Sequence, residues 1–275
     1  MNKFGNPTLA YLHRRWLARQ LVRAISPGRF LEIGIGSGYF YQDLLNRGFH
    51  GVGLDLNSDI ISEHENSNLQ FSGAIEFRST DFFLIREQFD LVIAFEVLEH
   101  YEQDLACLEK WKELLLPGGT LIFSVPAHRR QWTVNDSSAG HARRYEKVEL
   151  IEKLSRVRLF LEEIWCYGYP LLNLTYPLSS LFRLSKGASD PMALKPGNVG
   201  PENLSLESLE SRPLSSALMT NYRNTYDSGT RQFSSFGRFL LVEELWWPFL
   251  ELQRLWLTKD RGTGFMVKCR RESRE

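Results

Sequence analysis

A glycine-rich turn preceded by an acidic residue is the feature of this sequence with the clearest chemistry. Glu32, Gly34, Gly36 and Gly38 occupy alternate positions after a short apolar run. Such glycines let the backbone approach a ligand closely and expose its amide groups. A dinucleotide-binding pattern needs a third glycine where this chain has Tyr39, which disfavours a nicotinamide oxidoreductase. The Glu32 carboxylate suits a bound amino-acid ammonium group; a tight turn that merely requires glycine is the alternative.

Two further acidic residues stand where neighbouring strands are expected to end. Asp55 ends the apolar run 51–56, and Asp81 follows the weaker run 75–78. Open α/β sheets bind ligands at the carboxyl ends of their parallel strands, where a carboxylate can accept both hydroxyls of a ribose. Asp55 is placed for that role and Asp81 for the amino group of an adenine. Either acid alone could simply cap a turn.

Two carboxylates and an imidazole follow the apolar run 89–95. Glu96, Glu99 and His100 are spaced i, i+3 and i+4, which puts them on one face if a helix begins here. Such a mixed oxygen and nitrogen set suits Mg²⁺, Mn²⁺ or Zn²⁺. His141, in the loop after the fifth strand, should hang over the same edge and is the candidate fourth ligand. The alternative is that the acids only begin a helix, whose dipole favours them, and that His141 is structural.

The segment 126–150 contains four arginines, together with Trp132 and Tyr145. Exposed arginines are often only solvated, but their planar guanidinium groups also recognise phosphate or carboxylate. An imidazole directly beyond a strand end could act as general base if no metal binds, and aromatic rings could wall the pocket. The arginines and aromatic residues concerned are Arg129, Arg130, Arg143, Arg144, Trp132 and Tyr145. The candidate catalytic residues are His128, His141, Arg144 and Tyr145.

Alternating strands and helices must position these residues. Helical periodicity marks residues 7–25, 98–115, 148–158 and 236–257. The runs predicted as strands are RFLEI, 51–56, 75–78, 89–95, 121–125, 159–167 and 263–269. This alternation predicts βαβ units, and therefore a parallel sheet with helices on both faces.

Together, these segments resemble the class I S-adenosylmethionine-dependent methyltransferases. The matching motifs are FLEIGIGSGYF, GVGLDLN, STDFF, FDLVIAFEVLEH and LLLPGGTLIFSVP, and the resemblance covers about residues 20–167 and the last strand. It implies an α/β fold with a doubly wound, mostly parallel seven-stranded sheet whose last strand is antiparallel, and bound S-adenosylmethionine. Glu32, Gly34 and Gly36 would serve the methionine end of this donor, Asp55 its ribose and Asp81 its adenine. The match adds Gly38, Leu56, Phe82 and Phe95 to the donor site.

The Glu-x-x-Glu-His segment with a distant histidine is similar to two methyltransferase groups, the ubiquinone-pathway catechol O-methyltransferases and the small-RNA 2′-O-methyltransferases. Either resemblance implies a divalent ion beside the methyl donor, held by Glu96, Glu99, His100 and His141. The ion would bind the acceptor's oxygens and lower the pKa of its hydroxyl. Metal-free relatives also carry Leu-Glu-His at this place, so metal use stays open.

Composition narrows the classes of partner. The chain has 275 residues with 33 Lys and Arg against 33 Asp and Glu, so its formal net charge is zero. Neutrality disfavours nucleic acid as the partner and favours a small-molecule acceptor. Three scattered cysteines fit a reducing cytoplasm, the predicted location. No apolar run has the form of a signal peptide or the roughly 18 residues of a membrane span.

The sixth and seventh strands are normally close in sequence in this fold, but here residues 168–262 separate them. The predicted organisation is a core of residues 1–167 and 263–275 with 168–262 as an inserted lid or association subdomain. The apolar segment 236–257 could cover a hydrophobic substrate, touch a membrane surface peripherally, form a homodimer, or pack as an extra helical layer.

The sequence therefore predicts methyl transfer from S-adenosylmethionine to a small molecule. A hydroxyl of an aromatic or lipid-like acceptor is favoured because of the apolar insertion, with a divalent metal as assistant. The alternatives are an inactive donor-binding regulatory protein and an N- or C-methyltransferase without metal.

Overall fold

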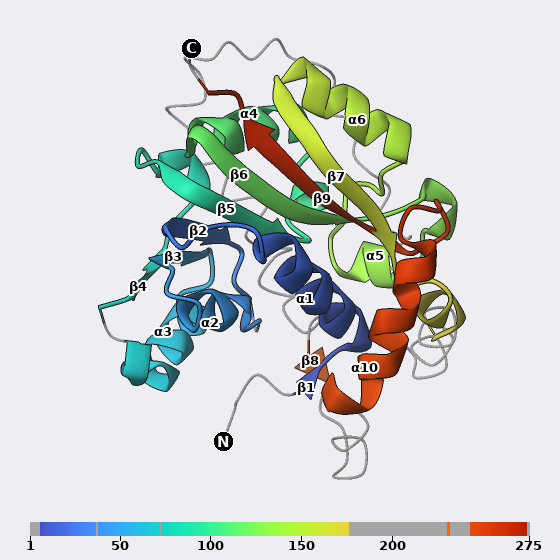
Figure 1. Ribbon diagram of the computed structural model, residues 1–275, viewed down its shortest axis with the longest axis horizontal. Helices are drawn as coiled ribbons and strands as arrows, with labels where there is room; N and C mark the ends of the chain where they lie inside the picture. The colour runs from blue at the N-terminus through green and yellow to red at the C-terminus, as the bar shows by residue number, and fades with distance from the viewer. Residues whose placement is uncertain (1–5, 37, 72, 176–229, 232–242, 274–275) are drawn as a thin grey trace.

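The computed structural model describes residues 6–36, 38–71, 73–175, 230–231 and 243–273 (Figure 1). Its strands are β1 (Asn6–Pro7), β2 (Arg29–Ile33), β3 (His50–Asp55), β4 (Ile75–Ser79), β5 (Phe89–Phe95), β6 (Leu115–Pro126), β7 (Leu159–Tyr167), β8 (Thr230–Arg231) and β9 (Gly264–Arg271). Its helices are α1 (Leu9–Val22), α2 (Phe40–Leu45), α3 (Ser58–Ser67), α4 (Asp104–Glu113), α5 (Val134–Ser138), α6 (Lys147–Arg156) and α10 (Glu243–Leu252).

Seven strands form one sheet in the order β4-β3-β2-β5-β6-β9-β7. Strands β2 to β6 pair in parallel, whereas β9 runs antiparallel to both of its neighbours, β6 and β7. After β2 the chain builds outward through β3 and β4, and β5 returns to the other side of β2. Ligands bind at such a switch point, beyond the carboxyl ends of the strands. The predicted doubly wound sheet with an antiparallel last strand is confirmed.

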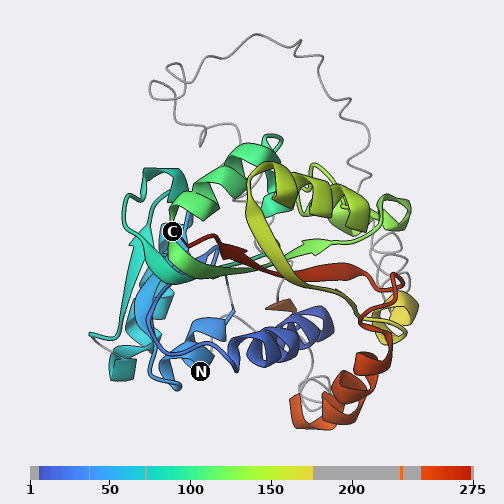
Figure 2. The ribbon, with the colours of Figure 1, turned by 45° about the horizontal axis from the view of Figure 1, so that its top comes forward.

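Helices cover both faces of this sheet because successive residues of a strand point to opposite sides. Val92 of β5 packs in the cluster that contains Trp111 of α4, and Ile93 packs in the cluster that contains Leu17 of α1. Figure 2 shows α4 and α6 above the sheet and α1 and α10 below it. From Leu91 to Ala94 the strand β5 is buried on both faces, as the apolar run LVIA predicts.

The predicted helix over residues 98–115 is wrong at both ends. Leu98–His100 is a short 3₁₀ turn, and the chain is extended at Tyr101 before α4 begins at Asp104. Asp104 is buried in the first turn of α4, where the helix dipole favours a carboxylate. Strand β6 already begins at Leu115, which leaves α4 shorter than its periodicity predicts.

The predicted insertion lies partly outside the described residues, so the division into a core and an inserted subdomain stays a prediction. Of the predicted helix 236–257, the structure describes α10 and a 3₁₀ turn over Gln253–Trp256. This part packs against α1, because Leu250 is buried and His13 Nδ1 lies 2.9 Å from Gln253 Oε1. No helix among the described residues combines the length and apolarity that crossing a bilayer requires.

Candidate methyl-donor and metal site

The glycine turn after β2 has a backbone conformation that is unfavourable for residues with a side chain. Gly34 has φ +70°, and a Cβ atom there would lie 2.9 Å from Val97 Cγ2. The amides of Gly34 and Ile35 donate to the carbonyl of Leu54, at 2.8 and 3.0 Å. Left-handed backbone favours glycine. The turn is therefore held against the end of β3, where Asp55 lies.

Asp55 organises this edge of the sheet. Its Oδ2 accepts a hydrogen bond from the Gly36 amide at 3.0 Å, and its Oδ1 accepts one from the Asn57 amide at 2.9 Å. The side chain is buried, with 2% exposed. Two backbone donors fix the carboxylate in one orientation, so it can accept further hydrogen bonds from a ligand without rearranging.

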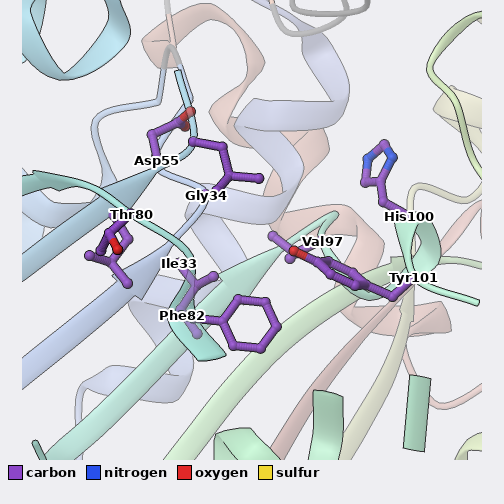
Figure 3. Close-up of a pocket in the computed structure, with 10 residues that line it drawn as sticks. Ile33, Gly34, Asp55, Thr80, Phe82, Val97, His100 and Tyr101 are labelled. Carbon is purple, nitrogen blue, oxygen red and sulfur yellow. The ribbon is translucent and has the colours of Figure 1, made fainter. Parts of the chain in front are cut away.

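A pocket opens beside Asp55 and reaches the predicted metal ligand His100 (Figure 3). Of the predicted donor residues, Gly34, Asp55, Leu56 and Phe82 line it. Its other lining residues are Ile33, Leu54, Thr80, Val97, His100 and Tyr101. Figure 3 shows Asp55 and Thr80 on one side of the pocket and His100 and Tyr101 on the opposite side. The donor residues and the predicted metal ligand His100 therefore share one pocket.

Five other predicted donor residues lie outside this lining, and Asp81, Phe95, Gly36 and Gly38 are four of them. Asp81 caps the 3₁₀ turn after β4, where its Oδ1 accepts the Phe83 amide at 3.0 Å, and burial raises its pKa. Phe95 packs edge-on against Phe40, with ring centroids 5.3 Å apart. Gly36 and Gly38 belong to the turn itself; a Cβ atom on Gly38 would lie 3.1 Å from the ring of Tyr11.

Glu32 is a buried acid that also lies outside the lining. It is 4% exposed, and its Oε2 accepts no hydrogen bond from the part of the chain that the structure describes. Burial, together with the Asp43 carboxylate, raises the pKa of Glu32 from 4.5 to about 8. Such a carboxyl group lacks a cationic partner strong enough to ionise it at neutral pH, and a ligand ammonium group would be one.

We expect Glu32→Gln to change how stability depends on pH. Because the pKa of Glu32 is raised on folding, the folded state keeps a proton that the unfolded state loses, so wild-type stability falls as pH rises from 4.5 to about 8. The variant should gain about 3 kcal/mol over the wild type between pH 5 and pH 8. Urea unfolding of the ligand-free protein at several pH values measures this gain. Glu65→Gln, at an exposed position of α3, is the control, and parallel curves for Glu32→Gln and wild type would contradict the expectation.

Three of the four predicted metal ligands come together. Ligand atoms of Glu99, His100 and His141 lie within 4.8 Å of one another. Glu99 Oε1 lies 3.7 Å from His141 Nε2, and the two imidazole rings are 5.0 Å apart at 83°. Glu99 is fully buried, and its oxygens accept no hydrogen bond from any described residue. Burial and the nearby Glu96 carboxylate raise its pKa well above 4.5.

The two histidines are held by neighbouring acceptors. Asp136 Oδ1 lies 3.1 Å from His141 Nδ1 and favours a proton on that nitrogen. The other ring nitrogen, Nε2, is then unprotonated and faces Glu99. His100 Nδ1 lies 3.3 Å from the Gly140 carbonyl. Burial and the adjacent His141 lower the pKa of His100 to about 4, so its imidazole is neutral at pH 7. Neutral imidazole is the form that binds metals.

Glu96 does not join this group, contrary to the predicted helical face. Its backbone has φ +54°, and the residues after it form a 3₁₀ turn rather than an α-helix. Its Oε1 accepts hydrogen bonds from Ser124 Oγ at 2.9 Å and Tyr167 OH at 3.3 Å, and its Oε2 lies 3.7 Å from Arg14. Because no α-helix begins here, the i, i+3 and i+4 spacing does not place Glu96 on the same face as Glu99 and His100.

Arg144 and Tyr145 belong to the framework, so their predicted catalytic roles gain no support from the geometry. Arg144 is 2% exposed and forms a two-point pair with Asp136, at 2.8 and 3.0 Å, while a third nitrogen donates to the Ala127 carbonyl. Tyr145 is fully buried and donates to Asp104 Oδ2 at 3.1 Å. The same Asp136 therefore orients both Arg144 and the metal-candidate His141.

The arginines of the segment 126–150 are largely paired with carboxylates of the protein. Arg129 bonds Glu149 at 2.7 Å, and Arg143 bonds Asp104 at 3.1 Å, so their charges are already balanced. Trp132 is 40% exposed and donates to Ser137 Oγ. Arg130 is exposed. The predicted recognition of an anion by these arginines gains no geometric support.

His128 does not line the donor pocket. It is 3% exposed and has φ +60°, with Nδ1 3.2 Å from Glu146 Oε2 and Nε2 3.3 Å from Asp260 Oδ1. Cys166 Sγ lies 3.7 Å from the same Nε2. A general base must reach the proton that it abstracts, and this ring is surrounded by protein groups. The geometry gives the predicted catalytic role of His128 no support.

The strand order, the glycine turn and Asp55 at the neighbouring strand end together define the class of S-adenosylmethionine-dependent methyltransferases. A sequence profile described as "Methyltransferase domain" matches residues 7–161. The chain belongs to this methyltransferase domain family.

Curated relatives are named ubiquinone biosynthesis O-methyltransferase. That of Hahella chejuensis (strain KCTC 2396) is 30% identical over 107 residues, covering 37% of this chain and 45% of the relative. That of Parvibaculum lavamentivorans (strain DS-1 / DSM 13023 / NCIMB 13966) is 26% identical over 150 residues, covering 52% and 56%. The chain spans about half the length of the curated relatives it matches.

Solved structures share the fold at low sequence identity. An S-adenosylmethionine-dependent methyltransferase from Mesorhizobium loti superposes with a TM-score of 0.54 at 14% identity, over 94% of this chain and 98% of that one. The [4+2]-cyclase SpnF gives a TM-score of 0.57 at 12% identity, over 94% and 81%.

Proposed function

We propose that this protein transfers a methyl group from S-adenosylmethionine to a hydroxyl of a small aromatic or lipid-like molecule, with a divalent metal as assistant. The observation that carries the proposal is the shared pocket, in which Asp55 and Gly34 meet His100 of the Glu99, His100 and His141 group. A donor on one side and a metal on the other would bring the methyl group and an acceptor oxygen together, and such orientation supplies much of the rate.

The donor would be held mainly by acids at the strand ends. Asp55 would accept the ribose hydroxyls, and Glu32 would ionise to bind the ammonium group directly or through water. The apolar side chains of Phe82 and Leu56 line the same pocket and suit the faces of an adenine. Asp81 would bind the adenine amino group after turning from its capping position.

The residues of the metal group fit a divalent ion. Glu99 offers a buried carboxylate that no described side chain satisfies, and a buried unpaired carboxylate is costly unless a cation joins it. Glu99, His100 and His141 would hold the ion, and Asp136 would keep His141 in the ligating tautomer. When bound, the ion supplies a lowered pKa for the acceptor hydroxyl.

Three observations support an apolar acceptor. A second pocket between α1 and α10 is lined by His13, Tyr169, Pro170, Leu171, Asn173, Leu174, Phe249, Leu252 and Gln253. On α10, Trp247 and Phe249 are 56% and 50% exposed. The curated relatives are named for ubiquinone biosynthesis, which is consistent with an aromatic acceptor that carries an apolar tail.

The test is a product assay. The full chain is incubated with S-adenosylmethionine and catechols that carry alkyl tails, alongside matched amine and carboxylate acceptors, and methylated products are identified by mass spectrometry. Methylation confined to the catechols, and abolished by a chelator, is the expected result. Methylated amines would favour an N-methyltransferase, and chelator-resistant methylation of the catechols would remove the metal from the proposal.

A donor-binding protein that does not methylate is the second candidate. It is supported by the likeness to SpnF, which is described as a [4+2]-cyclase, because a shared fold does not fix the chemistry. Calorimetric binding of S-adenosylmethionine with no methylated product across the acceptor set would favour this candidate.

A further inference from the structure

A second group of metal-ligating side chains lies outside the donor pocket. Cys166 is near the end of β7, where the chain leaves the sheet, and Asp260 is shortly before β9, where the chain returns to it. His128, which follows β6, lies between them. The ligand atoms of these three residues all lie within 4.8 Å of one another.

The distances match the edges of a tetrahedral zinc site. With Zn–S near 2.3 Å and Zn–N and Zn–O near 2.1 Å, neighbouring ligand atoms in a tetrahedron are about 3.4–3.6 Å apart. His128 Nε2 lies 3.7 Å from Cys166 Sγ and 3.3 Å from Asp260 Oδ1. An ion could therefore enter with only small movements of these side chains.

The hydrogen bonds around His128 and Cys166 resemble those that orient the ligands of known metal sites. Glu146 Oε2 lies 3.2 Å from His128 Nδ1, and the other Glu146 oxygen accepts the Arg129 amide at 3.0 Å. A carboxylate on one ring nitrogen fixes a histidine tautomer so that the other nitrogen can ligate. The Gly262 amide donates to Cys166 Sγ at 3.0 Å, which would stabilise a thiolate.

The charges favour a doubly charged, thiophilic cation. A thiolate at Cys166, a carboxylate at Asp260 and a neutral imidazole at His128 would balance the two positive charges of Zn²⁺, and the thiol proton would pass to solvent. Thiolate ligands select zinc over magnesium or calcium. Asp260 is 45% exposed, which leaves room for water as the fourth ligand.

We propose that His128, Cys166 and Asp260 bind a zinc ion that fastens the ends of β6 and β7 to the segment entering β9. The ion would thereby link the end of β7, at Cys166, to the segment before β9, at Asp260. This inference does not depend on the proposed function, because the Glu99 group contains no sulfur and the donor pocket none of these three residues.

Cobalt substitution tests the site independently of activity. Chelator-treated full-length protein is titrated with Co²⁺, and a thiolate-to-cobalt charge-transfer band in the near ultraviolet is expected at about one equivalent. Only a site with a cysteine ligand gives this band, so cobalt at the Glu99 group would not produce it. Zinc added afterwards should remove the band and raise the Tm.

Cys166→Ser should abolish the band and weaken zinc binding at least tenfold, whereas Cys269→Ser, at another buried cysteine, should keep both. If Cys166→Ser does not fold, Asp260→Asn on the partly exposed segment decides through the same loss of zinc affinity. Absence of a charge-transfer band in the wild type, or an unchanged band in Cys166→Ser, would overturn the proposal in favour of a simple thiol–imidazole contact.

Discussion

Asp55→Ala is expected to raise the dissociation constant of S-adenosylmethionine by at least about 100-fold. In the proposed site this carboxylate accepts both ribose hydroxyls, and each hydrogen bond to a charged group contributes about 1.5–3 kcal/mol. The same carboxylate holds the Gly36 and Asn57 amides, so its loss also loosens the glycine turn. Isothermal titration calorimetry with S-adenosylmethionine measures the change directly.

Asp59→Ala is the matched control, because Asp59 is an exposed acid four positions further along, in α3. It should leave donor affinity unchanged. Gly34→Val gives an independent check, since φ +70° and Val97 at 2.9 Å oppose any side chain there. Unchanged donor binding in both Asp55→Ala and Gly34→Val would show that S-adenosylmethionine does not bind in this pocket. Binding of NAD instead would indicate a nicotinamide-dependent protein.

The sheet could be predicted because its signals are local. The apolar sequence of β5 and the glycine turn after β2 each report their own environment, and β7 covers the residues that its sequence predicts. The donor-side acid Asp55 followed from its place at a strand end. The error over residues 98–115 arose because helical periodicity continues through a 3₁₀ turn and an extended residue that precede α4.

The site was harder to predict wherever a side chain is held by residues far away in sequence. The spacing predicts Glu96 as a metal ligand, but its carboxylate contacts Arg14 and Tyr167 instead. The place of His128 after a strand predicts a general base, but Cys166 and Asp260 lie against its ring. No local pattern encodes such pairs, because they depend on which strands become neighbours.

One missed residue had a local signal. Thr133 and Asp136 form a capping box at the start of α5, with Asp136 Oδ2 accepting from the Thr133 amide at 2.7 Å. Thr-x-x-Asp before a helix is a sequence signature of a helix start. Its second role, which is to orient His141 and pair Arg144, becomes visible only in the folded chain. Asp136 thus links a helix cap to the proposed metal group.

Glu99→Gln is expected to lower the rate of methyl transfer by about 10²–10³, which is the size of effect that losing one electrostatic contact to the transition state produces. The amide has nearly the same shape but no charge, so it would bind a divalent ion poorly. Donor affinity should stay at the wild-type value, since Glu99 does not line the pocket beside Asp55. Steady-state kinetics on a methylated acceptor and calorimetry with S-adenosylmethionine separate the two effects.

Unfolding cannot explain the loss that we expect from Glu99→Gln. Burial raises the pKa of Glu99 well above its ordinary value, so the metal-free protein gains little from a carboxylate there, and a neutral amide should keep or increase stability at pH 7. Glu102→Gln, at an exposed position just after the 3₁₀ turn, is the control and should keep full activity. If Glu99→Gln retains wild-type activity and a chelator has no effect, the Glu99 group does not bind an essential ion. The buried carboxyl would then serve only as packing beside His141, whose Nε2 lies 3.7 Å from its Oε1.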